Sequence, residues 1–302
     1  MSNSLRPTKF ADIVGQSDVV QRLSILTAGC KSSGQVMPHV LIDGPPGLGK
    51  TTMASAIANE MGQNLYTVNA ANIRSVKNIM PYLMGIDPRS VLFIDEIHRL
   101  PKLVEEFLYP VMEDFRLDIL VENKPESIDL PVFTLVGATT SGGSLSQPFY
   151  DRFIIKEHLI FYTPDELANL ARLNVDKLGI DISDEDLLEV AKRCKGTPRI
   201  LNARLQWYRS YLSYYGVVSN IDEVFENQGI DSNGFDVNDR MYIEILRKNR
   251  GTPLGIKAIS SMTGIAMETI ENSIEPFMVR MGYSIRTPKG RILGELPCKK
   301  SS

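Results

Sequence analysis

The chain has 302 residues, of which 43% are hydrophobic and 23% are charged. These values are typical of a soluble globular protein that is long enough for two or more domains. The 22 Gly and 17 Pro are too few for a fibrous or disordered chain, and no apolar run approaches the 18 residues of a membrane span. The three cysteines lie far apart and the first residues hold no signal-peptide core, so we expect a cytoplasmic protein without a disulfide framework or a membrane partner.

Charge is distributed unevenly along the chain. The formal net charge is −3, but residues 234–302 hold 11 Lys and Arg against 7 Asp and Glu, which leaves −7 for the residues before them. A basic segment attached to an acidic body is typical of a nucleic-acid contact module. A chance excess on a solvated surface gives the same count, and on charge alone it is the better explanation.

Strand-length apolar runs alternate with helical patterns through the first half of the chain. The expected strands span 39–43, 65–69, 90–95, 131–137 and 158–161, and the expected helices span 51–60, 75–83 and 103–115. Strands that alternate with helices usually pair in parallel, so this half predicts an α/β fold with a doubly wound parallel sheet.

The pattern then becomes purely helical from residue 162 to about residue 225. Thr163-Pro-Asp-Glu166 has the spacing of a capping box with Pro at the first helical position, and Ser183 and Thr197 begin two further helices. The turn-rich residues 227–234 follow as a linker. We therefore expect a small helical domain.

The last segment has the element order of a winged helix. Helices are expected at 236–248, 256–263 and 266–281, and strands at 283–286 and 291–293. The chain is thus expected to divide into three parts: 1–161, 162–230 and 231–302.

A phosphate-binding loop is predicted at residues 44–51. Gly44-Pro-Pro-Gly-Leu-Gly-Lys-Thr51 fits GxxxxGK[ST] and lies between an expected strand and an expected helix. Glycines let backbone N–H groups surround a phosphate, and the helix N-terminus adds its positive dipole end. Lys50 is expected to reach the β- and γ-phosphates of ATP, and the Thr51 hydroxyl to bind Mg²⁺. A glycine-rich turn that matches by chance is the alternative, and the strand–loop–helix context disfavours it.

Two carboxylates end a buried strand, with Asp95 45 residues after Lys50. In Val91-Leu-Phe-Ile-Asp-Glu96 they follow four apolar residues, and a parallel sheet binds its ligands at the carboxyl ends of its strands. Together with the phosphate loop, this predicts that Asp95 holds Mg²⁺ through water and that Glu96 is the general base toward the attacking water. Taken alone, the pair is better explained as a solvated strand end.

Further motifs occur in one order along nearly the whole chain. They are Leu5-Arg-Pro7 with Ile13-Val-Gly-Gln16, the phosphate loop, Phe93-Ile-Asp-Glu-Ile-His98, Leu108-Tyr-Pro-Val-Met-Glu-Asp-Phe-Arg-Leu-Asp118, Phe133-Thr-Leu-Val-Gly-Ala-Thr-Thr140, Gly196-Thr-Pro-Arg-Ile200 and Arg286-Thr-Pro-Lys-Gly-Arg291. In this order they resemble the RuvB family of AAA+ ATPases, the Holliday-junction branch-migration motors. The resemblance implies an AAA+ large domain, a helical lid and a winged helix. It also implies an ATP-driven homo-hexameric ring that acts on duplex DNA and four-way junctions in recombination and repair, with RuvA and RuvC as partners.

The resemblance implies a set of nucleotide-binding residues as well. They are Leu5, Arg6, Gly44, Gly47, Leu48, Gly49, Lys50, Thr51, Thr52, Tyr162 and Arg199. Thr140 is similar to sensor 1, a polar group beside the γ-phosphate and the lytic water. Arg199 is similar to sensor 2, and Pro198 at a helix start places it in the first turn of the lid helix. A surface arginine without such a role is the open alternative for Arg199.

Residues at the subunit boundary are implied in the same way. Arg152 matches the arginine finger, which enters the neighbouring subunit's site and stabilises charge on the transferring phosphoryl group. Glu113, Asp114 and Phe115 resemble a run that faces a nucleotide across that boundary. A core role for Phe115 and a solvated helix end for the two acids stay open.

The C-terminal wing is the predicted DNA contact. Arg286 and Arg291 flank a Thr-Pro-Lys-Gly turn with Lys289 beside them, and phosphate contacts by such residues give affinity without sequence preference. The wing could instead serve protein contacts only, and the basic excess of the segment favours DNA.

The chain departs from the family pattern in two places. Tyr150 stands where the family usually has the first arginine of Leu-Arg-Asp-Arg-Phe, so Arg152 is left as the one finger candidate. Residues 119–129, which correspond to the hairpin that docks on RuvA, form a shorter and more polar segment than usual. This puts a RuvA contact of the usual kind in question.

Two other classes of function share these features. A clamp-loader-like or initiator-like ATPase has the same core and uses ATP as a switch. A non-enzymatic assembly protein binds ATP for structure only, and Glu96 and Thr51 argue against it.

Overall fold

The computed structural model describes residues 5–121 and 124–294. The chain divides into two compact units, one made of residues up to 44 and 48–160, the other of residues 45–47 and those from 161 onward. None of the helices within the described ranges is long and apolar enough to cross a membrane.

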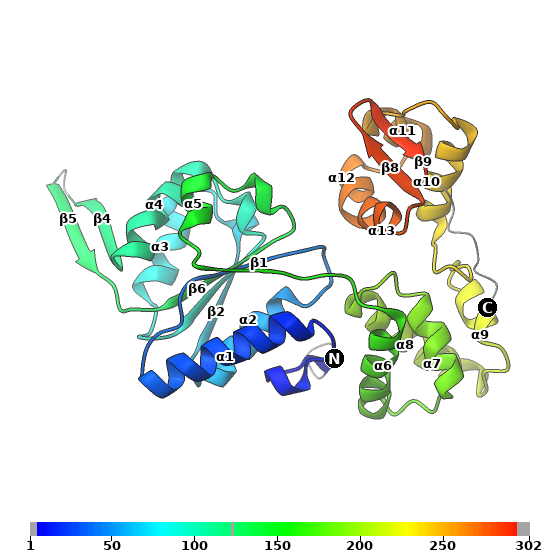
Figure 1. Ribbon diagram of the computed structural model, residues 1–302, viewed down its shortest axis with the longest axis horizontal. Coiled ribbons are helices and arrows are strands. Elements are labelled where there is room, and N and C mark those ends of the chain that lie inside the picture. The colour runs from blue at the N-terminus through cyan, green and yellow to red at the C-terminus, as the bar shows by residue number, and fades with distance from the viewer. Residues whose placement is uncertain (1–4, 122–123, 295–302) are drawn as a thin grey trace. The chain divides into compact units, whose positions relative to one another are not determined.

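A five-stranded parallel sheet forms the centre of the first unit (Figure 1). Its strands lie in the order β2-β3-β6-β1-β7, and every neighbouring pair is parallel. The bounds are β1 Val40–Asp43, β2 Leu65–Asn69, β3 Val91–Asp95, β6 Thr134–Thr139 and β7 Ile155–His158. The predicted α/β fold with a doubly wound parallel sheet is confirmed.

Helices cover both faces of this sheet. Figure 1 shows α1 (Ser17–Ser33) and α2 (Lys50–Met61) side by side on one face, with α3 (Val76–Met84), α4 (Lys102–Glu113) and α5 (Gln147–Asp151) on the other. Every second residue of a strand points to the same face of the sheet. On the face that α3, α4 and α5 cover, Leu92, Ile94 and Leu135 belong to one buried cluster with apolar residues of those helices. Short 3-10 turns lie at Phe10–Asp12, Ala70–Asn72, Ile97–Arg99 and Gly142–Ser144.

The last strand of this sheet lies earlier than predicted. The expected strand at 158–161 is wrong, because the chain pairs with β1 through Ile155–His158 instead. Strand β7 is at the edge of the sheet, so its Ile-Lys-Glu-His sequence does not need to be apolar. Leu159 and Phe161 are buried beyond the end of the strand, which explains the misleading apolar run.

An antiparallel hairpin projects from the first unit (Figure 1). It pairs β4 (Arg116–Val121) with β5 (Lys124–Asp129), and Leu117 lies opposite Ile128. Ile119 and Ile128 pack against the buried cluster of the unit. The segment that resembles the family's hairpin therefore does form one, with its base anchored by apolar contacts.

The second unit begins with a helical lid. Its helices are α6 (Pro164–Leu178), α7 (Asp184–Lys192), α8 (Pro198–Tyr215) and α9 (Ile221–Glu226). The predicted capping box is present, since Thr163 N donates to the Glu166 carboxylate at 2.8 Å and Glu166 N to Thr163 Oγ1 at 3.2 Å. Trp207 Nε1 donates to Val224 O at 2.7 Å and so ties α8 to α9.

A winged helix completes the second unit. It contains α10 (Val237–Lys248), α11 (Ile256–Thr263), α12 (Met267–Thr269), a π-helical turn (Ile270–Ile274), α13 (Glu275–Arg280), β8 (Ser284–Thr287) and β9 (Gly290–Leu293). The single helix expected at 266–281 is therefore wrong in detail. Pro276 has no N–H to donate and stands at the start of α13, directly after the π-helical turn.

Candidate functional site

Three predicted motifs meet at the carboxyl edge of the parallel sheet. The phosphate loop follows β1, Asp95 ends β3, and Thr140 follows β6. The register aligns these ends, because Asp43 lies opposite Thr139 on the neighbouring strand. Strand β6 lies between β1 and β3, so the sensor-1 candidate stands between the phosphate loop and the acidic pair.

The phosphate loop has positive φ angles at its glycines, a backbone conformation that other residues rarely adopt. At Gly44 φ is +144°, and a Cβ there would lie 2.6 Å from the Leu159 carbonyl oxygen, so only glycine fits. Gly49 is the N-cap of α2 with φ 102°, and Lys50, Thr51 and Thr52 form the first turn of that helix. Lys50 is buried, and its Nζ donates to Gly44 O at 2.6 Å. Its ammonium group therefore points back across the loop.

The acidic pair is held in a defined geometry. Glu96 has φ 52°, a left-handed conformation that is uncommon outside glycine and that often marks functional sites. Its backbone N–H donates to Asp95 Oδ1 at 3.0 Å, and its Oε2 accepts from Thr140 Oγ1 at 3.3 Å. The structure thus brings the predicted general base and the predicted sensor 1 into contact.

His98 joins this cluster, although no role for its side chain was predicted from the sequence. Its Nδ1 lies 3.5 Å from Glu96 Oε2 and 3.0 Å from Thr139 Oγ1. The 3-10 turn Ile97–Arg99 places it there, two residues after Glu96. The spacing in Asp-Glu-Ile-His is the signal from which it could have been found. Glu96, Thr140 and His98 together can orient a water molecule by hydrogen bonds.

The predicted metal ligands have suitable chemistry. Thr51 offers a hydroxyl in the first turn of α2, and Asp95 offers a carboxylate at the end of β3. Oxygen ligands of this kind, completed by water and phosphate oxygens, suit Mg²⁺. The donor set therefore fits a magnesium nucleotide.

Arg152 is held in one pose at the end of α5. Its Nη1 donates to Pro148 O at 2.7 Å, its Nη2 lies 3.1 Å from Glu113 Oε1, and its guanidinium lies 4.0 Å from the centre of the Tyr109 ring. The side chain is 19% exposed. The sequence predicted Arg152 and Glu113 separately, and the structure brings them together. Tyr109 was missed, since nothing in its local sequence points to Arg152.

The other residues of the boundary run lie differently. Asp114 is exposed, while the Phe115 ring lies 5.9 Å from the His39 ring and 5.8 Å from the Phe133 ring. Phe115 therefore packs against aromatic rings of its own chain, which agrees with the alternative of a core role. Tyr150, where the family usually has arginine, lies under Lys156, whose Nζ is 4.5 Å from its ring centre.

The remaining nucleotide-pocket candidates are divided between the two units. Leu5 is buried and Arg6 is exposed in the first unit. Tyr162 is buried in the second unit, where Arg199 is exposed as the second residue of α8. The predicted place of Arg199 in the first turn of a lid helix is confirmed. That these four residues meet at one nucleotide stays a prediction.

A buried carboxylate organises the wing. Glu275 is fully buried, and it accepts from Arg286 Nε at 2.8 Å, from Arg291 Nε at 2.7 Å and from the Tyr242 hydroxyl at 3.2 Å. The hydrogen bond to Glu275 raises the pKa of Arg291, and burial raises the pKa of Tyr242. Lys289 is exposed.

The three predicted DNA contacts therefore differ in exposure. Arg286 is 52% exposed, whereas Arg291 is 16% exposed and also lies 3.4 Å from Glu271 Oε1. Arg286 pairs with Glu275 as well, with its Nη2 2.6 Å from Glu275 Oε2, but it and Lys289 are exposed enough to meet a phosphate. Arg291 is mostly buried against Glu275 inside its own domain. Glu275 was missed from the sequence, because it lies 11 and 16 residues before the arginines, on another element.

Family models match almost the whole chain. The model described as the Holliday junction DNA helicase RuvB P-loop domain matches residues 5–159. The RuvB AAA lid domain matches residues 162–236, and the RuvB C-terminal winged helix domain matches residues 232–299.

Individual relatives agree with these matches. The chain is 41% identical over 298 residues to the Holliday junction branch migration complex subunit RuvB of Rhodopirellula baltica, covering 96% of this chain and 81% of that protein. The solved RuvB Holliday junction branch migration motor of Thermotoga maritima has a TM-score of 0.88 at 37% identity, covering 96% of each chain. A point variant of that protein has a TM-score of 0.89 at 36% identity with the same coverage. The chain therefore belongs to the RuvB family of AAA+ P-loop ATPases.

Proposed function

We propose that this protein is an ATP-driven motor that forms a homo-hexameric ring, translocates duplex DNA and drives branch migration of Holliday junctions. The contact between Glu96 and Thr140 beside the phosphate loop is the observation that carries the proposal. An ATPase that hydrolyses its nucleotide needs a positioned base next to the phosphate-binding loop. Membership of the RuvB family supports the DNA substrate.

The proposed hydrolytic site uses residues of two neighbouring subunits. Lys50 binds the β- and γ-phosphates, and Thr51 and Asp95 hold Mg²⁺, which supplies charge neutralisation at the phosphates. Glu96, supported by Thr140, takes the proton of the attacking water. Arg152 of the adjacent subunit stabilises charge on the transferring phosphoryl group. The tethered pose of Arg152 supports this role, because an arginine that acts across an interface benefits from a fixed geometry.

The other parts of the proposal concern organisation and partners. We assign ATP hydrolysis to residues 1–161, nucleotide sensing to a lid at 162–230, and DNA contact to a winged helix at 231–302. Leu5, Arg6, Tyr162 and Arg199 complete the nucleotide pocket, and Glu113 and Asp114 face it across the boundary. The hairpin of β4 and β5 is the proposed docking site for a RuvA-type protein, with a RuvC-type resolvase as a further partner. The proposed location is the cytoplasm.

ATP hydrolysis on a synthetic four-way junction tests the main proposal. The rate should rise when the junction is added together with a RuvA-type protein, and labelled junctions should separate into the products of branch migration. Stimulation without RuvA would indicate a motor that loads by itself. No stimulation by any duplex would refute the motor proposal and favour an ATP switch of the clamp-loader class.

Mixed rings test the division of the site between subunits. Arg152→Ala and Glu96→Gln should each be inactive alone, because each variant lacks one component of every site. A mixture should recover part of the activity, since some interfaces then combine an intact Glu96 with an intact Arg152. A mixture of Glu96→Gln with Lys50→Ala, which lie on the same side of the site, is the control and should stay inactive. Full activity of Arg152→Ala alone would refute the finger assignment.

A further inference from the structure

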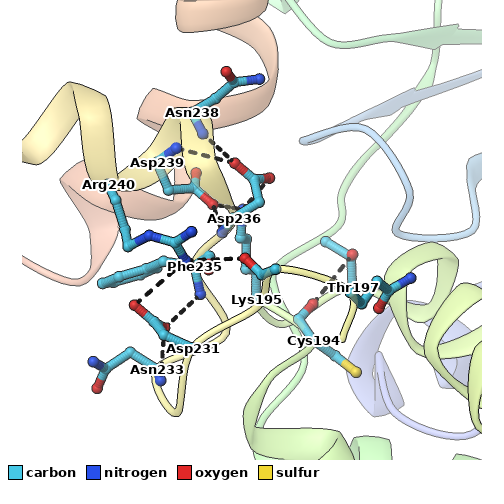
Figure 2. A network of polar contacts seen from close by, with 12 residues as sticks. Cys194, Lys195, Thr197, Asp231, Asn233, Phe235, Asp236, Asn238, Asp239 and Arg240 are labelled. Carbon is cyan, nitrogen blue, oxygen red and sulfur yellow. Dashed lines mark hydrogen bonds and ion pairs between the residues drawn. The ribbon is translucent and has the colours of Figure 1, made fainter. Parts of the chain in front are cut away.

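Lys195 joins the lid to the winged helix inside the second unit (Figure 2). Its Nζ donates to the Asp239 carboxylate and lies 3.4 Å from Asp236 Oδ2. Lys195 is 7% exposed and Asp239 is fully buried, so the pair is shielded from solvent. A lysine is seldom buried without a partner, and removing one side of a buried pair leaves the other charge uncompensated.

The two carboxylates are themselves fixed at the start of α10. Asp236 is the N-cap, and its Oδ1 accepts from Asn238 N at 2.8 Å and from Asp239 N at 3.0 Å. Asp239 Oδ2 accepts from Asp236 N at 2.9 Å, which completes a capping box. Lys195 therefore binds carboxylates that backbone N–H groups at the start of α10 hold in place, as Figure 2 shows.

The chain between the lid and α10 is also held closely. Gly234 has φ +80°, and a Cβ there would lie 2.6–2.8 Å from backbone atoms of Arg193, so the two backbones are in direct contact. Asp231 Oδ1 accepts from Phe235 N at 2.9 Å, and Arg240 Nη1 donates to Phe235 O at 2.7 Å. The turn-rich segment that the sequence predicts as a linker is thus packed against the lid.

Lys195 also lies directly before the sensor-2 segment. Thr197 N donates to Cys194 O at 3.0 Å and Thr197 is the N-cap of α8, whose second residue is Arg199. Lys195 itself has φ 49°, an uncommon conformation for a residue with a side chain, which persists only where its surroundings fix it. One short turn therefore connects Arg199 at one end with the anchor of α10 at the other.

We propose that Lys195 is the positioning residue that makes the lid and the winged helix move as one body, so that a displacement of the Arg199 segment is transmitted to the DNA-binding wing. The proposal rests on the proposed function in one respect, because it takes Arg199 as the nucleotide sensor and the wing as the DNA contact. Its mechanical part, the rigid connection through Lys195, Asp236 and Asp239, does not depend on that function.

The test needs a variant that removes the connection and keeps the fold. Lys195→Met alone leaves the buried carboxylate of Asp239 without its cationic partner and is expected to be less stable. Lys195→Met combined with Asp239→Asn removes both charges, while the amide oxygen can still accept from Asp236 N. Lys192→Met is the matched control, since this lysine is 49% exposed, lies three residues earlier and pairs with Glu189.

ATP hydrolysis and branch migration by the full chain give the functional result. In the double variant, basal kcat and duplex affinity should stay within twofold of the parent protein. Stimulation of kcat by a four-way junction should fall at least fivefold, and the ATP consumed per migrated junction should rise by a similar factor. Lys192→Met should match the parent. Undiminished stimulation in the double variant, or an equal loss of basal and stimulated rates, would overturn the proposal.

A distance measurement tests the mechanical part without DNA. Nitroxide labels at Ser210→Cys on α8 and Ser261→Cys on α11, with Cys30 and Cys298 replaced by Ser, report the spacing of lid and winged helix. We expect one narrow distance, the same with ADP and with a non-hydrolysable ATP analogue, and a distribution at least twice as broad in the double variant. A distribution that stays narrow would overturn the proposal. Broadening in a protein that junctions do not stimulate would keep the connection and refute the proposed function alone.

Discussion

Replacing Glu275 with Gln is expected to loosen the wing and leave the other domains unchanged. The buried carboxylate accepts from Arg286, Arg291 and Tyr242, with its two oxygens shared among them. The amide of Gln keeps one oxygen and turns the other acceptor into an NH₂ group that faces arginine N–H groups. The charge that compensates two guanidinium groups is lost at the same time.

The magnitude follows from the burial of each partner. A hydrogen bond to a charged group contributes about 1.5–3 kcal/mol, and breaking a buried ion pair costs about 3–5 kcal/mol. Arg286 is 52% exposed, so water can replace much of the hydrogen bonding that its guanidinium loses. Arg291 is 16% exposed, so less of its lost hydrogen bonding can be replaced by water. We expect the free energy of opening β8 and β9 to fall by about 3 kcal/mol, which is about a hundredfold in the opening equilibrium.

Amide hydrogen exchange measures this locally. Peptides that cover β8 and β9 should exchange about a hundredfold faster in Glu275→Gln, while peptides of the parallel sheet should be unaffected. Glu271→Gln is the matched control, because it carries the same change on the preceding turn and its side chain is 50% exposed, 3.4 Å from Arg291. Its effect should be about twofold or less. A change below fivefold in Glu275→Gln, or equal effects in both variants, would refute the argument.

Three further outcomes are expected. Glu113→Gln should lower kcat about tenfold, because it frees Arg152 from its ion pair. The free energy of unfolding should change by less than about 1 kcal/mol, because Glu113 is exposed. An unchanged kcat in steady-state assays would show that Arg152 needs no such support. Burial lowers the pKa of His39, so below about pH 6.5 the imidazole takes up a proton in the unfolded chain but not in the folded one. Denaturant titrations should therefore show that the free energy of unfolding falls as pH is lowered from 7 to 5.5, and that it falls less in His39→Gln. Equal losses in the two proteins would contradict this. Burial raises the pKa of the Cys194 thiol to about 12, so iodoacetamide at pH 8 should modify the partly exposed Cys30 and spare Cys194. Peptide mass spectra would measure this, and similar modification of both cysteines would argue against a closed lid core.

The central strands could be predicted from the sequence because they are buried. Leu65–Asn69 was predicted to the residue and Val91–Asp95 to within one residue, since buried parallel strands appear as apolar runs of the right length. Helix α1 was not predicted. Its buried residues are only Val19, Leu23 and Thr27, spaced by four, which gives too narrow an apolar stripe to stand out.

The candidate site, too, could be predicted only in part from the sequence. The phosphate loop with Lys50 and the pair Asp95 and Glu96 follow predicted strands of a parallel sheet, and this was enough to predict that both lie at its carboxyl edge. Thr140 was assigned through the resemblance to the RuvB family. The supports of the site depend on packing between distant segments. Glu113 against Arg152, and Lys195 against Asp239, are pairs of ordinary charged residues in the sequence, and only the folded chain brings them together.

The position of the one tryptophan has a practical consequence for spectroscopy. Trp207 is the only tryptophan in the chain, and it lies half-buried on α8 with its indole bonded to Val224 O. Emission excited at the red edge of indole absorption therefore comes from a single point in the lid, eight residues after Arg199 on the same helix. Neither the parallel sheet nor the winged helix contributes a tryptophan to that signal. The native chain thus contains its own optical reporter, which can follow the lid through a nucleotide cycle without any added label.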